Sequence, residues 1–333
     1  MRIWLDLANS PQVLFFGPIL TELDGRGHEV EVTSRAYAQT THLADQLKIR
    51  HQTIGGHGGR RLLSLLSQNV ARALALIRWA RGRRFALAVS HNSYSQAIAA
   101  ALMRIPFVTL MDYEHQPLNH LCFRLANRVI VPEAFPVESL EKYGARGKSE
   151  TYPGVKEQIY LSDFEPDPDF LRRESLASDR ALVVLRPPAP WTAYHRFENG
   201  LFDLVLEKLT GEEEADCLFL PRVPSQAESV RHLSRLKIAD RVYDGPNLLH
   251  HAQLVVSGGG TMNRESAIIG TPTFTVFKGE LGAVDRSLIE RGRLQQLQTE
   301  SDIGKLKIRA ADNRKPLLSS TNLLSEVTDQ ILG

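Results

Sequence analysis

The feature that most constrains the fold is a regular alternation of short apolar runs with longer stretches of helical periodicity. Such alternation is typical of strands joined through helices, which produces a parallel α/β sheet with helices on both faces. In the stretch 13–26, for example, apolar residues recur at helical spacing until Gly25-Arg26-Gly27 stops the helix. We expect strands near 3–7, 29–33, 50–54, 86–90, 107–111 and 128–131 and, in a second sheet, near 181–185, 217–220, 241–243, 254–256 and 272–277.

The chain length of 333 residues favours two domains. The two blocks of alternation are separated by an acidic stretch that Pro166 and Pro168 interrupt, which is typical of a connection between domains. We therefore expect an N-terminal Rossmann-like domain over 1–155, a linker over 156–178 and a C-terminal Rossmann-like domain over 179–318. A C-terminal helix is expected within 319–333.

Composition narrows the classes of function. The formal net charge is only +2, with both signs nearly balanced, so nothing favours a nucleic-acid partner. Cys122 and Cys217 form no CxxC pair, so neither a disulfide framework nor a zinc site is indicated, and a reducing cytoplasm is the expected location. The first seven residues are typical of a strand rather than a signal peptide. No apolar run approaches the length of about 20 residues that spans a bilayer.

A glycine-rich segment in the second half has the pattern of an anion site. Ser257, Gly258, Gly259 and Gly260 follow the apolar run 254–256, and Thr261 opens a helix-like stretch. A glycine turn between a strand and a helix points backbone N–H groups and the helix dipole at one place, where a phosphate group is the natural ligand. A tight turn without a ligand is the alternative, which the polar side chains of the first helical turns, including Arg264 and Glu265, disfavour.

Polar loops follow the strands of the first half, and a parallel sheet brings such loops to one edge. Ligands of open α/β sheets bind at that edge, although polar loops are also the default at sheet surfaces. The loops cover 8–12, 55–59, 91–95 and 112–115, and the residues of interest are Asn9, Ser10, Gln12, His91, Ser93, Asp112, Glu114 and His115.

The stretch from Arg60 to Arg84 is the most basic segment and carries seven arginines among leucines. A helix with an apolar stripe and a basic remainder is able to lie on anionic lipid, which would make the protein peripheral to the inner face of a membrane. An ordinary packed helix with a solvated basic face is the alternative reading.

The chain also resembles a known family. The resemblance extends over nearly the whole chain and depends on Asp6, 9–16, 26–30, Gly154-Val155-Lys156-Glu157, the segment Gly259-Gly260-Thr261-Met262-Asn263-Arg264-Glu265, and 282–285. This is a prokaryotic domain-of-unknown-function family whose members are described as predicted GT-B glycosyltransferases. The resemblance implies two Rossmann-like domains that face a central cleft, with a nucleotide-sugar bound in the cleft.

The nucleotide-sugar 2-epimerases and the lipid-linked N-acetylglucosaminyltransferase of peptidoglycan synthesis are similar in the second half. Both carry a Glu five residues before a Gly-x-Pro, the spacing of Glu265 and Gly270 here. By this resemblance Gly259, Gly260 and Thr261 hold the diphosphate. Glu265 accepts hydrogen bonds from the ribose, and Asp285 binds the donor sugar. The other nucleotide-sugar contacts that we expect in this region are Ser257, Gly258 and Arg264. Arg186 would neutralise the leaving diphosphate.

The catalytic base is not evident. Gln12 and Leu14 stand where members of the family often carry His, and glutamine is no general base. His195 lies in a segment similar to one of the 2-epimerases, but Ser93 stands where those enzymes carry an acid. We expect catalysis from the 112–115 loop, that is Asp112, Glu114 and His115, together with His195; Asp6 and His91 are further candidates for the base.

These observations predict a metal-independent GT-B glycosyltransferase that transfers a hexosyl or N-acetylhexosaminyl group from a nucleotide-sugar such as a UDP-sugar. No resident cofactor is expected, and the acceptor, whether a glycan, a lipid-linked sugar or a small molecule, is open. A 2-epimerase-like isomerase and a non-catalytic nucleotide-sugar-binding protein are the alternatives. The Asp167-Pro168-Asp169 triplet has the letters of a metal-binding motif but falls in the expected linker.

Overall fold

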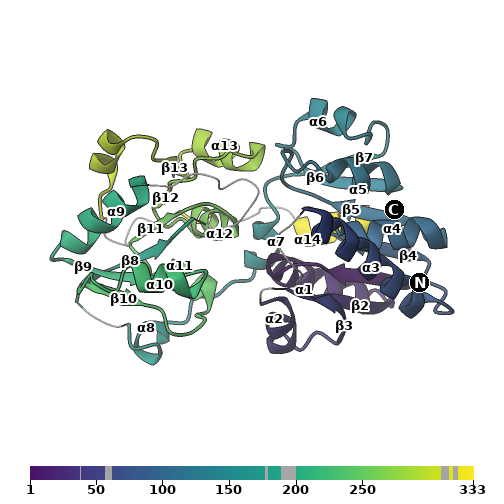
Figure 1. Ribbon diagram of the computed structural model, residues 1–333, viewed down its shortest axis with the longest axis horizontal. Coiled ribbons are helices and arrows are strands. Elements are labelled where there is room, and N and C mark those ends of the chain that lie inside the picture. Colours follow the sequence, from purple (N-terminus) through teal and green to yellow (C-terminus); the bar gives the residue numbers. More distant parts are fainter. Residues whose placement is uncertain (38, 57–61, 177–178, 189–199, 309–314, 318–321) are drawn as a thin grey trace. The chain divides into compact units, whose positions relative to one another are not determined.

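The computed structural model describes residues 1–37, 39–56, 62–176, 179–188, 200–308, 315–317 and 322–333. For residues 62–66 it describes the backbone alone. The chain divides into two compact units. Unit 1 contains Met1–Tyr160 and Ser319–Gly333, and unit 2 contains Leu161–Leu318. Each unit has its own parallel sheet, so the expected α/β class with two sheets is confirmed (Figure 1).

The sheet of unit 1 has the strand order β3-β2-β1-β4-β5-β6-β7, and every neighbouring pair is parallel. The order reverses between β1 and β4, where Asp6 lies in register with Ser90. This reversal is a topological switch point, the place where ligands of such sheets bind. The strands are β1 (Arg2–Leu7), β2 (Glu29–Ala36), β3 (His51–Gly56), β4 (Leu87–Ser90), β5 (Phe107–Leu110), β6 (Arg128–Pro132) and β7 (Ser149–Tyr152).

Helices cover both faces of this sheet, and each face has its own apolar core. One core joins α1 and α2 with α14, which comes from the other end of the sequence and lies beside α1 (Figure 1). The second core joins α3, α4, α5 and α6 around Trp4 and Phe123. The helices are α1 (Ser10–Gly25), α2 (Thr40–Gln46), α3 (Leu62–Ala80), α4 (Tyr94–Met103), α5 (Asn119–Leu125), α6 (Val137–Lys142), α7 (Glu157–Leu161) and α14 (Leu323–Leu332).

Unit 2 repeats this plan with the order β10-β9-β8-β11-β12-β13, again parallel throughout. Its switch point lies between β8 and β11, and α9 packs on one face of the sheet. The elements are α8 (Phe170–Arg173), β8 (Ala181–Arg186), α9 (Gly200–Gly211), β9 (Ala215–Phe219), α10 (Pro224–Ser229), β10 (Leu236–Ile238), α11 (Gly245–His251), β11 (Leu254–Ser257), α12 (Thr261–Ile269), β12 (Thr273–Thr275), α13 (Ala283–Glu290), β13 (Gln295–Gln296) and a 3-10 helix (Glu300–Lys305).

One expected strand is wrong. Residues 241–243 form no strand, although Val242 and Tyr243 favour one, because Val242 is exposed and has nothing to pack on. The edge strand is β10 instead, where the buried Leu236 lies in register with Cys217. The edge strands β7 and β13 were not expected, since their sequences contain no apolar run.

The segment 156–178 is more ordered than an open connection. It contains α7 and α8, and the buried Ile159 and Phe170 anchor these helices. Ile159 belongs to the α1 core of unit 1, while Phe170 lies in unit 2 and stacks on His251. No helix in the described part of the chain is long and apolar enough to cross a bilayer.

A buried ion pair joins four elements of unit 1. The Arg72 guanidinium on α3 donates to both carboxylate oxygens of Asp6 on β1, at 2.7 and 2.8 Å. Ser93 and Thr33 also donate to Asp6, at 2.5 and 2.6 Å. Burial by itself raises the pKa of Asp6, but the Arg72 charge and these hydrogen bonds outweigh it, so the pKa lies below its ordinary value.

This pair predicts acid sensitivity. The folded pKa of Asp6 lies below the unfolded value, so its contribution to stability is present above about pH 4 and is lost as the pH falls through the folded pKa. Asp6→Asn leaves Arg72 buried without its counter-charge, which we expect to cost roughly 3–5 kcal/mol at neutral pH. Urea unfolding of both proteins from pH 7 to pH 3 measures this, with the exposed Asp24→Asn as the control. An Asp6→Asn protein as stable as wild type would contradict the role of the pair.

A second prediction concerns Gly270, which ends α12 at a φ of +91°. A Cβ atom there would lie 2.9 Å from the carbonyl oxygen of Lys315. We expect Gly270→Ala to lower the free energy of unfolding by about 2 kcal/mol, because left-handed backbone and backbone contact both oppose the methyl group. Gly211→Ala, at the end of α9 with nothing within 4 Å, is the matched control and should be neutral or stabilising in the same urea titration. Equal effects of the two substitutions would refute this account.

Candidate functional site

At the switch point of unit 2, β11 ends in the glycine turn that the sequence singled out. Ser257 lies in register with Arg186 at the end of β8. A Cβ atom on Gly258 would lie 2.3 Å from the Cα atom of Pro188, so only glycine fits between the two chain segments. Gly259 and Gly260 both have a φ of +99°, and Gly260 is the N-cap residue of α12, which has no side-chain cap. The start of α12 therefore has the arrangement that binds anions at helix N-termini in other proteins.

Two side chains shape this turn from inside. The Ser257 hydroxyl donates to Asn263 Oδ1 at 2.6 Å and accepts from the backbone N–H of Gly259 at 3.1 Å. Both side chains are buried. Ser257, which we expected among the nucleotide-sugar contacts, thus has a defined structural role in the turn.

Two arginines lie at the edge of this turn, and one of them was not expected. Arg222 follows β9; its Nε donates to the carbonyl of Pro187 at 2.9 Å and its Nη2 to that of Gly259 at 3.1 Å. Burial, followed by the charge of Arg186, lowers the pKa of Arg222 to about 9. The position of Arg222 just beyond a strand next to the switch point is the signal that could have identified it.

Arg186 reinforces this positive charge. Burial lowers its pKa, which the nearby Glu265 partly counteracts. Among the described residues, neither Arg186 nor Arg222 has a carboxylate within ion-pair distance, whereas many surface arginines of this chain do. Two like charges held together under partial burial are stabilised by a bound anion.

The side chains of Arg264 and Asp285 form an ion pair with each other. Arg264 on α12 donates to both carboxylate oxygens of Asp285 on α13, at 2.9 and 3.0 Å. The carboxylate therefore neutralises the guanidinium. The expectations that Arg264 binds the nucleotide and that Asp285 binds the sugar stay predictions, with this ion pair as the local geometry. Glu265 is buried on α12, and Thr261 is the first residue of that helix.

The switch point of unit 1 gathers the polar residues expected on the acceptor side. Gln12 is buried; its amide donates to the His91 carbonyl at 2.7 Å, and its Oε1 accepts from the backbone of Ala8 at 2.6 Å. Ser93 caps α4 by accepting from the Gln96 backbone and also donates to Asp6. Gln12 and Ser93 therefore hold the loops in place.

Ser10 and Asn9 complete this loop at the start of α1. The Ser10 hydroxyl accepts from the Gln39 backbone at 3.1 Å, which ties the helix to the residue before α2. Asn9 is the N-cap residue of α1, but its side chain makes no capping hydrogen bond.

A cluster of ionisable side chains lies beyond β4 and β5. The two oxygens of the Asp112 carboxylate are divided between a histidine and a lysine: His91 Nε2 lies 3.5 Å from Oδ1, and Lys156 Nζ forms a close ion pair with Oδ2. Lys156 also lies 3.2 Å from Glu157 Oε1. All four side chains are buried. Lys156 and Glu157 were part of the family pattern but were not expected to join Asp112.

Glu114 and His115 form a separate pair in the same loop. Their side chains meet at 3.3 Å, and Glu114 is buried while its backbone carbonyl accepts from the Tyr143 hydroxyl at 2.6 Å. The structure thus brings Asp112 together with His91, and Glu114 with His115. His195, the fourth expected catalytic residue, lies outside the described residues. Within the described part of the chain, no group of three or more His, Cys, Asp or Glu side chains is arranged to hold a metal ion.

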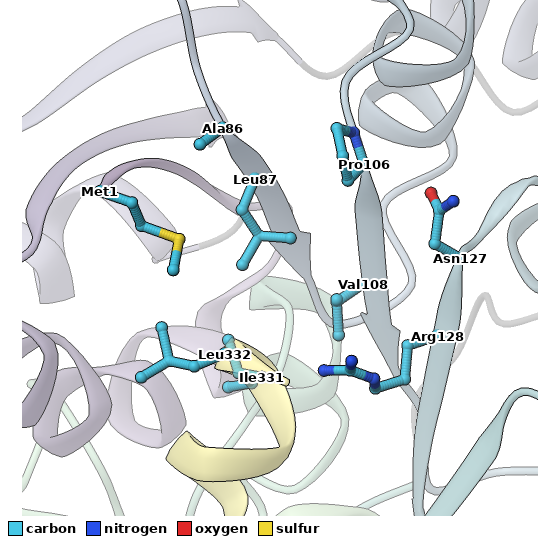
Figure 2. Close-up of a pocket in the computed structure, with 9 residues that line it drawn as sticks. All are labelled: Met1, Ala86, Leu87, Pro106, Val108, Asn127, Arg128, Ile331 and Leu332. Carbon is cyan, nitrogen blue, oxygen red and sulfur yellow. The ribbon is translucent and has the colours of Figure 1, made fainter.

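A pocket of about 320 Å³ lies at the opposite edge of the unit 1 sheet. Figure 2 shows the side chains of Met1, Leu87 and Val108 around it, with Ile331 and Leu332 from α14. Met1, Leu87 and Val108 lie at the amino ends of the strands, away from the loops that carry the ionisable cluster. The lining is mostly aliphatic, with Asn127 and Arg128 as its polar members, and it contains none of the residues expected in the site.

Comparisons with known proteins identify the family of this chain. The family model described as "Protein of unknown function (DUF354)" matches residues 1–329. A protein of Methanocaldococcus jannaschii described as uncharacterised is 28% identical over 300 residues, which cover 88% of this chain and 87% of that protein.

Solved structures show the same fold at low sequence identity. The UDP-GlcNAc 2-epimerase of Methanocaldococcus jannaschii, in complex with UDP-GlcNAc and UDP, aligns with a TM-score of 0.77 at 12% identity over 100% of this chain and 99% of that one. MurG of Acinetobacter baumannii aligns with a TM-score of 0.57 at 14% identity over 99% of each chain. These alignments confirm two Rossmann-like units of the GT-B class. The chain is therefore a member of the DUF354 family, with the fold of UDP-sugar epimerases and GT-B glycosyltransferases.

Proposed function

We propose that this protein is a glycosyltransferase that uses a nucleotide-sugar donor and holds the donor diphosphate at the glycine turn of unit 2. The observation that carries this proposal is the pair of guanidinium groups, Arg186 and Arg222, beside the uncapped start of α12. Structural neighbours described as binding UDP or a UDP-sugar support the choice of ligand.

The charge of the site fits a diphosphate better than a neutral sugar. Arg186 and Arg222 carry two positive charges at neutral pH, and Glu265 is the carboxylate whose charge bears on Arg186. Backbone N–H groups at the start of a helix add further donors for phosphate oxygens. A diphosphate brings enough negative charge to balance the two guanidinium groups, and it leaves Glu265 for the ribose hydroxyls.

The same groups have a role in the reaction itself. When the bond from the sugar to the nucleotide breaks, negative charge develops on the leaving diphosphate. Positive side chains and helix N-terminal N–H groups that are already in position stabilise this charge without reorganisation. We therefore assign Arg186, Arg222 and the 258–261 turn to the leaving group, a role that needs no metal ion.

For proton removal from the acceptor we propose the Asp112 cluster of unit 1. In this scheme His91 takes the proton, and the Asp112 carboxylate stabilises the imidazolium that forms, as in other base-carboxylate pairs. Lys156 binds the second carboxylate oxygen and so orients Asp112. The residues whose roles we assign in this way are His91, Asp112 and Lys156.

A 2-epimerase is the second candidate, because several of the structural neighbours are described as 2-epimerases and unit 1 holds buried carboxylates at Asp112, Glu114 and Glu157. That reaction exchanges a proton at the sugar carbon without any acceptor. Incubation of UDP-sugars with the protein in deuterium oxide, followed by mass spectrometry of the sugar, separates the two reactions. Deuterium in the sugar in the absence of an acceptor would favour the epimerase. A protein that binds donor without transfer, hydrolysis or exchange would be a non-catalytic binding protein.

The donor site predicts the effect of removing either guanidinium. Arg186→Gln and Arg222→Gln should each weaken UDP binding about 10- to 100-fold, because each removes a charged hydrogen-bond donor from the diphosphate. Isothermal titration calorimetry measures this. The exposed Arg231→Gln, in the same unit, is the matched control and should bind UDP as wild type does. Unchanged affinity in both site variants, with an intact fold by circular dichroism, would rule out this site.

The proposed base predicts a loss of turnover without a loss of donor binding. Asp112→Asn should lower the rate of sugar transfer or donor hydrolysis by about 100-fold or more, because the imidazolium loses its counter-charge. UDP affinity should stay within twofold of wild type, since the side chains that we propose to bind the diphosphate belong to unit 2. Asp45→Asn, an exposed carboxylate of unit 1, is the control for both measurements. A turnover rate equal to that of wild type would exclude Asp112 from the reaction.

A further inference from the structure

The distribution of charge along unit 1 is very uneven. Residues 46–111 contain ten lysines and arginines and no aspartate or glutamate. A run of 66 residues without a carboxylate leaves its cations to pair with other segments or with solvent. Two of them find internal partners: Arg72 pairs with Asp6, and Arg83 pairs with Glu31.

Among the described residues, the other cations at the C-terminal ends of α3 and α4 have no such partner. Arg78 is exposed on the outer face of α3. Arg81 and Arg84, just beyond the end of α3, and Arg104, just beyond the end of α4, are exposed as well. None of the four forms an ion pair with a carboxylate in the described part of the chain, where α3 and α4 pack against each other. This side of unit 1 is therefore a surface of net positive charge.

The same surface carries aliphatic side chains that the core does not use. The inner face of α3 buries Ala73, Leu76 and Ala80 against the sheet. On the outer face, Val70 is 52% and Leu74 is 60% exposed, and Leu102 at the end of α4 is 69% exposed. Residues 70, 74, 78 and 81 follow helical spacing, so the two aliphatic residues and two arginines form one stripe.

We propose that this surface binds an anionic lipid bilayer. We define it as the basic apolar face, made of Val70, Leu74, Arg78, Arg81, Leu102 and Arg104. Aliphatic side chains flanked by arginines match the interface of such a bilayer, where the former enter the headgroup layer and the latter bind lipid phosphates.

The identity of the exposed side chains selects lipid over nucleic acid. Single-stranded nucleic acid is bound by exposed aromatic rings that stack on bases. The aromatic residue of α3, Trp79, instead packs against Phe85 and Trp4 and lies under the Arg83 guanidinium. The outer stripe is aliphatic and basic. Because only a few aliphatic groups are exposed, the contact depends on the negative charge of the lipid, and the protein is peripheral to the bilayer.

Vesicle co-sedimentation of the full chain tests the proposal. We expect binding to vesicles of phosphatidylcholine with phosphatidylglycerol and no binding to phosphatidylcholine alone, with release at high salt. The double variant Arg78→Glu, Arg81→Glu should bind at least about 30-fold more weakly, the equivalent of about 1 kcal/mol for each arginine. Leu74→Ser combined with Leu102→Ser should weaken binding several-fold at unchanged charge.

Matched controls come from unit 2. The double variant Arg231→Glu, Arg235→Glu makes the same change of charge at exposed positions, and Val242→Ser removes an exposed aliphatic group. Both should bind vesicles within about twofold of wild type. Binding that is absent from anionic vesicles, or that the control substitutions reduce as much as the face substitutions, would overturn the proposal. Because UDP affinity is measured separately, the lipid result does not depend on the nucleotide-sugar function.

Discussion

The geometry of a parallel sheet is the constraint on which the rest of the structure depends. Each strand must be joined to the next by a crossover, so the carboxyl ends of all strands in a unit emerge at one edge. The strand order reverses once in each sheet, at β1/β4 and at β8/β11. At that reversal the crossovers leave in opposite directions and open space beside the strand ends. In each unit, the ionisable residues of the candidate site lie near this position.

The two edges differ in the kind of charge they hold. In unit 2 the guanidinium groups of Arg186 and Arg222 lie together without a paired carboxylate among the described residues, so local charge favours a bound anion. In unit 1 the ionic groups neutralise one another, as in Asp6 with Arg72 and Asp112 with Lys156. The first arrangement suits binding of a charged ligand, and the second suits positioning and proton transfer. This contrast is the physical argument for our proposal that unit 2 binds the donor and unit 1 carries the base.

Sequence patterns predicted the elements better than the partnerships within the site. The alternation of apolar runs located strands of both sheets, and the spacing around Gly258 located the turn before α12, because these features depend on residues close in sequence. Arg222 and Lys156 were missed as members of the site. Each contacts a residue that is distant in sequence, Gly259 and Asp112 respectively, and only the folded chain brings these residues together. Arg264 and Asp285 were expected to face a ligand separately, and nothing in their spacing indicated that they bind each other. Polar edge strands such as β7 carried no apolar signal at all.

The return of the last helix to unit 1 has a consequence for the order of synthesis. The core that α1 shares with Leu323, Val327 and Ile331 of α14 stays incomplete until the ribosome has made all of unit 2. During that interval the apolar surface that α14 later covers, on α1 and the neighbouring strands of unit 1, is open to solvent. The strands of the unit 2 sheet, by contrast, have all been synthesised by then. Unit 1, although it comes first in sequence, thus cannot complete its core before unit 2 has been synthesised, unlike a domain that folds on its own as it leaves the ribosome.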